Sequence, residues 1–222
     1  MYEFNFALVF ASFDKLLLGA WLTIRLCCAA MLLGLIVSIT CAWSKTSGPA
    51  PVRFVINIYV EVIRNTPFLV QIFFIFFGLP SLGLRFSPNE AALVALVVNF
   101  GAYGTEIIRA GIESISKGQV EAGTALGLSR LQIFRYIVMI PALRTVYPSL
   151  TSQFIYLMLT SSVVSVVSAN DLAAAGNDLQ SATFASFEVY VIITIMYLLM
   201  SIGFSGLFST IGRISFKYPL SR

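Results

Sequence analysis

The chain has 222 residues, of which 58% are hydrophobic and only 11% are charged, and its formal net charge is +4. This composition lies outside the range of water-soluble globular domains and indicates an integral membrane protein. Histidine is absent and the three cysteines have no metal-ligand spacing, which argues against a metal site, cysteine–histidine catalysis and disulfide bonding.

Five segments are long and apolar enough to cross a membrane, because about 20 helical residues at 1.5 Å each span the hydrocarbon core. The predicted spans are about residues 16–43, 54–79, 91–111, 145–168 and 189–211. We therefore expect an all-α integral membrane fold in a single transmembrane domain, residues 1–222. The N-terminus lacks the basic region and cleavage site of a signal peptide, so the first span is expected to remain in the mature protein. In this first span, Gly19, Gly34 and several alanines offer surfaces for close helix packing.

The second span carries an acidic and a basic residue three positions apart, followed by a proline. Glu61 and Arg64 share a helix face at this spacing and can neutralise each other. Thr66 and Pro67 follow, and because Pro67 frees the backbone carbonyl of Ile63 we expect a kink there. The residues Glu61, Arg64, Thr66 and Pro67 are interpreted either as a helix-packing element or as part of a gate.

The most polar segment, about residues 112–144, separates the third span from the fourth. It contains a turn rich in small residues, which comprises Gly118, Glu121, Ala122, Gly123 and Gly127. Several cations surround this turn, as is typical of a segment on the cytoplasmic side of a membrane. We expect this segment to lie in the cytoplasm, where it forms either a helix that docks on another protein or an amphipathic loop helix with no partner.

The fourth span has no charge but many hydroxyl groups. Helical spacing gives two stripes, which are Ser149, Ser152, Gln153, Tyr156 and Thr160, and then Ser161, Ser165 and Ser168. Either these side chains line a path for a solute, with Gln153, Tyr156, Thr160 and Ser161 as the candidates, or they hydrogen-bond to their own and neighbouring helices. The segment that follows, residues 169–187, is predicted to be a polar loop.

Lysine and arginine are distributed unevenly between the predicted loops, and this bias sets the orientation of a membrane protein. One side carries ten of them and the other side two. The ten are Lys45, Arg53, Arg109, Lys117, Arg130, Arg135, Arg144, Arg213, Lys217 and Arg222, and the two are Lys15 and Arg85. We therefore expect the N-terminus outside, and the polar segment and the C-terminus in the cytoplasm.

Several stretches together resemble one protein family. The segment Lys117 to Arg144 resembles the EAA loop of ABC-transporter permease subunits, with Gly123 where a second alanine is usual. The stretches YVEVIRNTPFLVQIFFIFFGLP (Tyr59 to Pro80) and NFGAYGTEIIRAGIESISKGQVEAG (Asn99 to Gly123) resemble the polar amino-acid branch of these permeases, which includes histidine, glutamine, arginine and opine importers. With SQFIYL, SSVVSV and FEVY further along, the resemblance covers roughly residues 16–212.

The resemblance implies a type I ABC importer fold, with five transmembrane helices and a short cytoplasmic coupling helix. In this family the EAA loop docks in a cleft of a separate ATPase subunit, so Gly118, Glu121, Ala122, Gly123 and Gly127 are the expected ATPase-coupling residues. ATP and Mg²⁺ are expected on that partner and no cofactor on this chain, which has no GxxxxGK[ST] stretch. The other implied partners are a second permease copy or homologue and an extracytoplasmic solute-binding protein. The implied location is the bacterial inner membrane, and no nucleic-acid partner is expected.

One departure from the family bears on the cargo. Where many relatives have lysine and aspartate before threonine and serine in the fourth span, this chain has Leu159 and Thr160 before Ser161 and Ser162. An acidic residue at this place would suit a cationic solute. Its absence favours a neutral polar or zwitterionic one.

The expected function is thus the membrane-spanning subunit of an ATP-driven importer for a polar amino acid or a derivative. The alternative is a stand-alone secondary transporter or channel for small polar solutes. Ion coupling would require intramembrane carboxylates, and the fourth and fifth spans contain none. A membrane enzyme is disfavoured by the absence of histidine and of a convergent acid–base set.

Overall fold

Helices account for every regular element in residues 4–216, the part of the chain that the computed structural model describes. Four of them are long and apolar enough to cross a membrane, and a bent pair gives a fifth crossing if it is counted as one span. The four are α2 (Phe13–Ser47), α5 (Pro88–Glu113), the helix Ile133–Val167 and α10 (Ser186–Ser215). Lys217 and Arg222, which contribute to the predicted orientation, lie outside the described residues.

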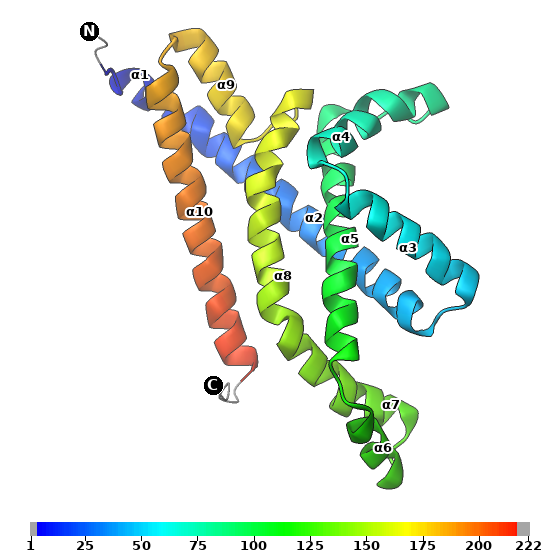
Figure 1. Cartoon of the computed structure of the whole chain (residues 1–222). Coiled ribbons are helices and arrows are strands. Elements are labelled where there is room, and N and C mark those ends of the chain that lie inside the picture. The colour runs from blue at the N-terminus through cyan, green and yellow to red at the C-terminus, as the bar shows by residue number, and fades with distance from the viewer. Residues whose placement is uncertain (1–3, 217–222) are drawn as a thin grey trace.

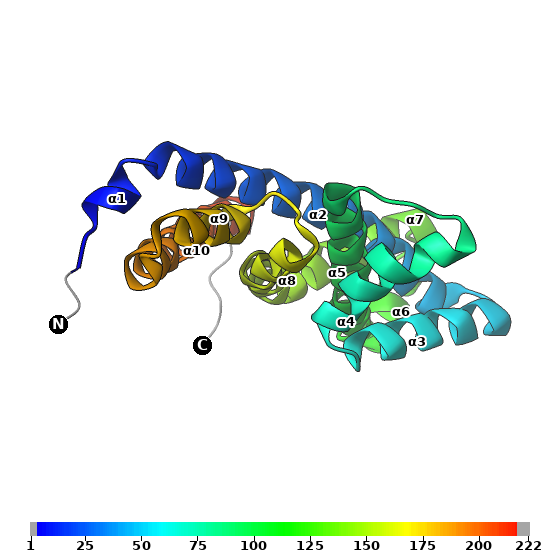
Figure 2. The same cartoon turned by 90° about the horizontal axis from the view of Figure 1, so that it is seen from above.

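The long helices form one layer of near-parallel rods with an oblique rod behind it. Helices α5, α8 (Ile140–Thr160) and α10 run side by side, and α2 crosses behind them (Figure 1). Seen from above, α2 lies along one side of this row, α3 (Ala50–Arg64) and α4 (Phe68–Phe73) lie beside α5 on the other side, and that other side of α8 and α10 is left uncovered (Figure 2). The short helices α1 (Ala7–Phe10) and α9 (Leu172–Thr183) lie at one end, and α6 (Lys117–Ala125) and α7 (Arg130–Gln132) lie at the other.

Small residues allow α2 and α5 to cross at short range, as the sequence predicted for Gly34. A Cβ atom at Gly34 would stand 2.8 Å from the Phe100 ring, and one at Gly104 would stand 2.2 Å from the hydroxyl of Ser38. The buried Ser38 hydroxyl donates to the carbonyl of Gly101 across the crossing, at 3.1 Å. Close backbone approach with interhelical hydrogen bonds is the usual way for helices to associate in membranes.

The second predicted span is broken, and the kink expected at Pro67 is confirmed. Helix α3 (Ala50–Arg64) and the segment Phe68–Leu82 meet at an angle of 111°. The second half consists of α4 (Phe68–Phe73), the π-helical turn η1 (Phe74–Gly78) and the 3₁₀ turn η2 (Leu79–Leu82). Residues 54–79 are therefore not one straight helix, because the chain turns through more than a right angle after Arg64.

The predicted polar loop over residues 169–187 contains a helix, and that part of the prediction is wrong. Asp171 caps α9 by accepting a hydrogen bond from the backbone N–H of Ala174, at 2.7 Å. The backbone N–H of Leu172 donates to the hydroxyl of Thr23 on α2, at 2.9 Å. Since Leu172 and Leu179 are also buried, α9 is stabilised by packing on its neighbours rather than by a continuous apolar run.

The fourth crossing helix begins well before the predicted residue 145. The π-helical turn η3 (Ile133–Met139) leads directly into α8, so the last part of the predicted loop 112–144 is already helical. Pro141 stands in the first turn of α8 and has no N–H to donate, and irregular turns are common where a proline interrupts the helical hydrogen-bond ladder. The 3₁₀ turn η4 (Ser161–Val167) continues the helix at its other end.

Candidate functional site

The small-residue turn predicted from the sequence forms a short exposed helix at one end of the molecule. Helix α6 is nine residues long and contains Gly118, Glu121, Ala122 and Gly123. It follows α5 after a three-residue connection and lies at the far end from α4 and α9 (Figure 1). Glu121 and Ala122 are exposed, and nothing lies within 4 Å of a Cβ atom placed on Gly118.

Gly127 ends α6 in a left-handed backbone conformation, with φ at +74°. The backbone N–H of Leu128 donates to the carbonyl of Gly123 at 3.1 Å, and that of Gly127 donates to the carbonyl of Thr124 at 3.0 Å. This pair of bonds is the Schellman arrangement that closes a helix C-terminus. A side chain with a Cβ atom is disfavoured at this φ even where space is open.

Gly123 is the one buried residue of α6, because this helix packs against η3. A Cβ atom at Gly123 would stand 2.5 Å from Cδ1 of Ile137 and 3.2 Å from Cγ1 of Ile133. The glycine found where the EAA pattern usually has alanine thus fits the close packing of these two isoleucines, since an alanine here would make the end of Ile137 shift. The contact holds α6 on the start of the fourth crossing helix.

The tip of the polar segment carries apolar side chains that nothing in the described residues covers. Leu126 is 79% exposed and Leu131 is 74% exposed. Both flank Gly127 and lie beyond the long helices, on the connection that joins α6 to η3. These two leucines therefore add apolar surface to the most polar segment of the chain.

A cluster of charges ties α5 to α2 near this end. Glu106 accepts from the ammonium of Lys45 at 2.5 Å and from the guanidinium of Arg109 at 2.8 Å. Arg109 also pairs with Glu113, one helical turn further on. The spacing of Glu106 and Arg109 is visible in the sequence, whereas the link to Lys45 depends on how α2 and α5 cross.

At the broken span, Thr66 and Pro67 are joined to the next turn by a buried glutamine. The side-chain amide of Gln71 donates to the carbonyl of Ile63 at 2.7 Å, and to the carbonyl and hydroxyl oxygens of Thr66 at 3.0 and 3.1 Å. The carbonyl of Ile63 is the one that Pro67 was expected to leave free. No role in holding the break was predicted for Gln71, although its place four residues after Pro67 was a usable signal.

The ion pair expected between Glu61 and Arg64 is not among those that the described residues form, and this prediction is wrong. Both side chains are exposed. Glu61 instead accepts from the side-chain amide of Asn65 at 2.9 Å. Arg64 lies over the ring of Tyr103 on α5, with its guanidinium carbon 5.6 Å from the ring centre. A shared helix face does not bring two side chains together when each has a better partner elsewhere.

The predicted path residues on α8 divide into two groups. Gln153, Tyr156 and Thr160 lie on successive turns, with Tyr156 exposed and the other two half-buried. The amide nitrogen of Gln153 is buried and has no hydrogen-bond partner in the described part of the chain. Ser161 does not join this group, because it is fully buried and donates to the carbonyl of Met158 on its own helix, at 2.7 Å.

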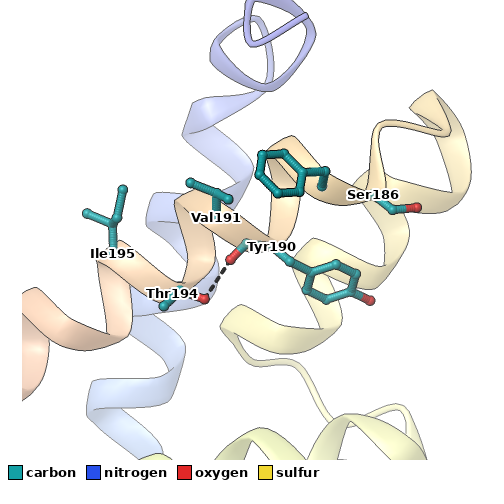
Figure 3. A pocket seen from close by; sticks show the side chains of 6 residues that line it. Ser186, Tyr190, Val191, Thr194 and Ile195 are labelled. Carbon is teal, nitrogen blue, oxygen red and sulfur yellow. Dashed lines mark hydrogen bonds between the residues drawn. The ribbon is translucent and has the colours of Figure 1, made fainter. Parts of the chain in front are cut away.

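Two open hollows lie on the surface of α10, and none of the predicted path residues lines either of them. One, of about 520 Å³, is lined by Ser186, Phe187, Tyr190, Val191, Thr194 and Ile195. Figure 3 shows that all of these come from one helix and that the hydroxyl of Thr194 donates to the carbonyl of Tyr190, at 2.7 Å. The other, of about 540 Å³, is lined by Ile155 of α8 and by Ser201, Ile202, Ser205, Gly206 and Ser209. Neither contains an acid or a base, and no group of acidic or cysteine side chains in residues 4–216 has the arrangement of a metal site.

Comparison with known proteins gives a consistent result. Residues 30–213 match the family described as the binding-protein-dependent transport system inner membrane component. The glutamine transport system permease protein GlnP of Escherichia coli (strain K12) is 32% identical over 213 residues, which cover 95% of this chain and 97% of the relative. The nopaline transport system permease protein NocM of Agrobacterium fabrum (strain C58 / ATCC 33970) is 34% identical over 210 residues, which cover 90% of this chain and 87% of NocM. Among solved structures, a crystal structure of an amino acid ABC transporter with histidines superposes with a TM-score of 0.89 at 34% identity, over 96% of this chain and 99% of the other.

Proposed function

Because this chain belongs to the family of binding-protein-dependent transport system inner membrane components, we propose that it is the membrane-spanning subunit of an ATP-driven importer for a polar amino acid or a derivative. The membership bears out the family resemblance found in the EAA loop, and the superposition on an amino acid ABC transporter bears out the type I importer fold. As a permease, the chain is a multi-pass protein of the inner membrane.

The exposed helix α6 is the observation that supports this function most directly. Its end is closed by Gly127 and its buried face rests on η3, while Leu126 is exposed at its tip and Leu131 is exposed on α7. A helix with this surface can dock in a cleft of an ATPase subunit. That subunit would hold ATP and Mg²⁺. Gly118, Glu121 and Ala122 lie on this helix and are the proposed coupling residues together with Gly123 and Gly127.

Two further partners are part of this proposal, a second permease subunit and a solute-binding protein. On the side away from α2, α8 and α10 are uncovered (Figure 2), and a second permease copy or homologue facing them would complete a two-fold path. An extracytoplasmic binding protein would deliver the solute at the end that carries α4 and α9. Gln153, Tyr156 and Thr160 are the proposed path residues. With no acidic residue at position 160, the solute would be a neutral polar or zwitterionic amino acid.

Substitution of Gly127 tests the coupling role. Gly127→Leu places a Cβ atom in a left-handed conformation, which costs about 1–2 kcal/mol and loosens the end of α6. Asparagine tolerates this conformation, so Gly127→Asn is the matched control. We expect Gly127→Leu to insert normally but to lose uptake of a panel of radiolabelled polar amino acids, with reduced co-purification of the ATPase subunit. Gly127→Asn should retain both.

Two results would contradict this role. One is wild-type uptake by Gly127→Leu. The other is loss of the Gly127→Leu protein from the membrane fraction while Gly127→Asn remains, which would assign Gly127 to folding rather than to coupling.

A further inference from the structure

A hydrogen bond between two buried amides joins the broken second span to α5. The side-chain N–H of Asn99 donates to the carbonyl oxygen of Gln71, at 2.9 Å. Gln71 is 7% exposed and Asn99 is 5% exposed, so water cannot readily replace either partner. In such surroundings a buried polar group left without its partner is costly, which favours a fixed geometry.

Gln71 uses its whole amide group at this place. Its two N–H groups are taken by the carbonyl of Ile63 before the break and by the two oxygens of Thr66 at the break. Only its carbonyl oxygen remains, and that is the atom that accepts from Asn99. The amide of Asn99 therefore holds both halves of the broken span through one side chain.

Helix α5 connects this amide pair to α6. It runs without a break from Pro88 to Glu113, and α6 follows after three residues. At the other side of the pair, α4 contacts both α5 and η4, the turn that begins directly after Thr160. Figures 1 and 2 both place α4 beside α5, and Figure 1 shows it at the end of the molecule away from α6.

We propose that Asn99 and Gln71 are positioning residues that tie the break in the second span to α5, so that a displacement of α6 reaches the break and the end of α8. This role rests on the proposed function, because it takes α6 as the docking site of an ATPase. The pair acts as a mechanical link and touches no solute. Without it, α5 still moves with α6, but the segment Phe68–Leu82 keeps only its apolar packing on α5 and follows less closely.

The test uses the full-length chain, purified with the ATPase subunit that binds it and labelled at single cysteines with an environment-sensitive fluorophore. One reporter replaces the exposed Gln119 on α6 and the other replaces Phe77, which is 64% exposed, beyond the break. The background carries Cys27→Ala, Cys28→Ala and Cys41→Ala. The signal is the change in emission on addition of ATP, Mg²⁺ and vanadate.

Asn99→Leu removes the link and leaves the bonds from Gln71 across the break intact. We expect the response at position 119 to persist and the response at position 77 to fall about 5-fold or more, within the usual range of coupling between sites. Tyr59→Phe is the matched control, because the Tyr59 hydroxyl donates to the carbonyl of Val98 at 2.7 Å and so joins α3 to α5 before the break. Both reporters should respond normally in Tyr59→Phe.

Different outcomes would contradict the positioning role of Asn99 and Gln71 and the docking of an ATPase on α6. Equal responses at position 77 in Asn99→Leu and in the unsubstituted chain would overturn the positioning role while leaving the importer function intact. If neither reporter responds in the unsubstituted chain, the docking of an ATPase on α6 is itself wrong. If Asn99→Leu is not recovered from membranes, Asn99→Ala removes the same donor with a smaller side chain and also leaves the bonds from Gln71 across the break intact, and the same loss at position 77 is expected.

Discussion

Gly123 shows how a single residue departs from the EAA pattern of the family for a reason found in the packing of this chain. An alanine there would force its Cβ atom to within 2.5 Å of Ile137. The departure from the EAA pattern is therefore matched by two isoleucines on η3, which occupy the space of the missing methyl group. The sequence shows the glycine, but only the packing of α6 on η3 gives the reason for it.

Thr160 is the residue at which the cargo can be tested. It is half-buried at the last position of α8, on the same side as Gln153 and Tyr156. Thr160→Asp places a carboxylate in a stretch, residues 145–168, that has no charged side chain, so uptake of neutral amino acids should fall about tenfold or more and the order of preference should move toward cationic ones. Thr160→Asn is the uncharged control and should keep the original order. Competition of uptake by a panel of amino acids measures the order, and an unchanged order in Thr160→Asp would show that Thr160 only packs helices.

At the scale of elements, α9 depends on its cap. Asp171 is 1% exposed, accepts from the backbone N–H of Ala174 and receives a longer hydrogen bond from the hydroxyl of Tyr197, at 3.4 Å. Burial raises the pKa of the Asp171 carboxyl to about 6. Because this pKa is above its unfolded value, the stability that protonation contributes is present at low pH and is lost as the pH rises through about 6.

Two substitutions separate the cap from the charge. Asp171→Asn keeps an acceptor for Ala174 and removes the buried charge, so its melting temperature should equal or exceed that of the wild type at about pH 7.5, with the advantage disappearing at about pH 5. Asp171→Ala removes the acceptor and should lower stability by about 1 kcal/mol at both pH values. Scanning calorimetry of the purified protein gives these values. A melting temperature of Asp171→Asn below that of the wild type at the higher pH would mean that the carboxylate is needed in its charged form.

The sequence predicted those features that depend on neighbouring residues in the chain, and it did not predict those that depend on contacts between distant segments. The break at Pro67 and the turn at Gly127 follow from backbone chemistry and were predictable. The partner of the freed carbonyl of Ile63 was not named, because a sequence does not say which side chain reaches it. Helix α9 was missed because its apolar residues are too few to form a run, although Asp171 before Leu172 is a usable N-cap signal.

At the scale of the whole molecule, the orientation of the chain across the membrane is predicted from the distribution of lysine and arginine between the ends of the spans. Cysteines introduced at Gly48 or Gly118 should be shielded from membrane-impermeant thiol reagents added to intact cells, and cysteines at Ser81 or Asn177 should be labelled. Permeabilised cells provide the control, since all four should then react. Strong labelling of position 118 from outside would reverse the orientation and remove α6 from the cytoplasm.

The slant of α2 has a consequence for the lipid around the protein. Its 35 residues at 1.5 Å each give a rod of about 52 Å, well above the thickness of about 30 Å of a bilayer core. The rod accordingly runs obliquely across the others (Figure 1), and it is fastened near both ends, by Gly19 against α9 and by Lys45 against Glu106. A thinner bilayer would increase the tilt of such a helix from the membrane normal, and a thicker bilayer would decrease it. A change in the tilt of α2 would shift both of these contacts. We therefore expect the positions of α9 and of the Glu106 end of α5 to depend together on the thickness of the membrane.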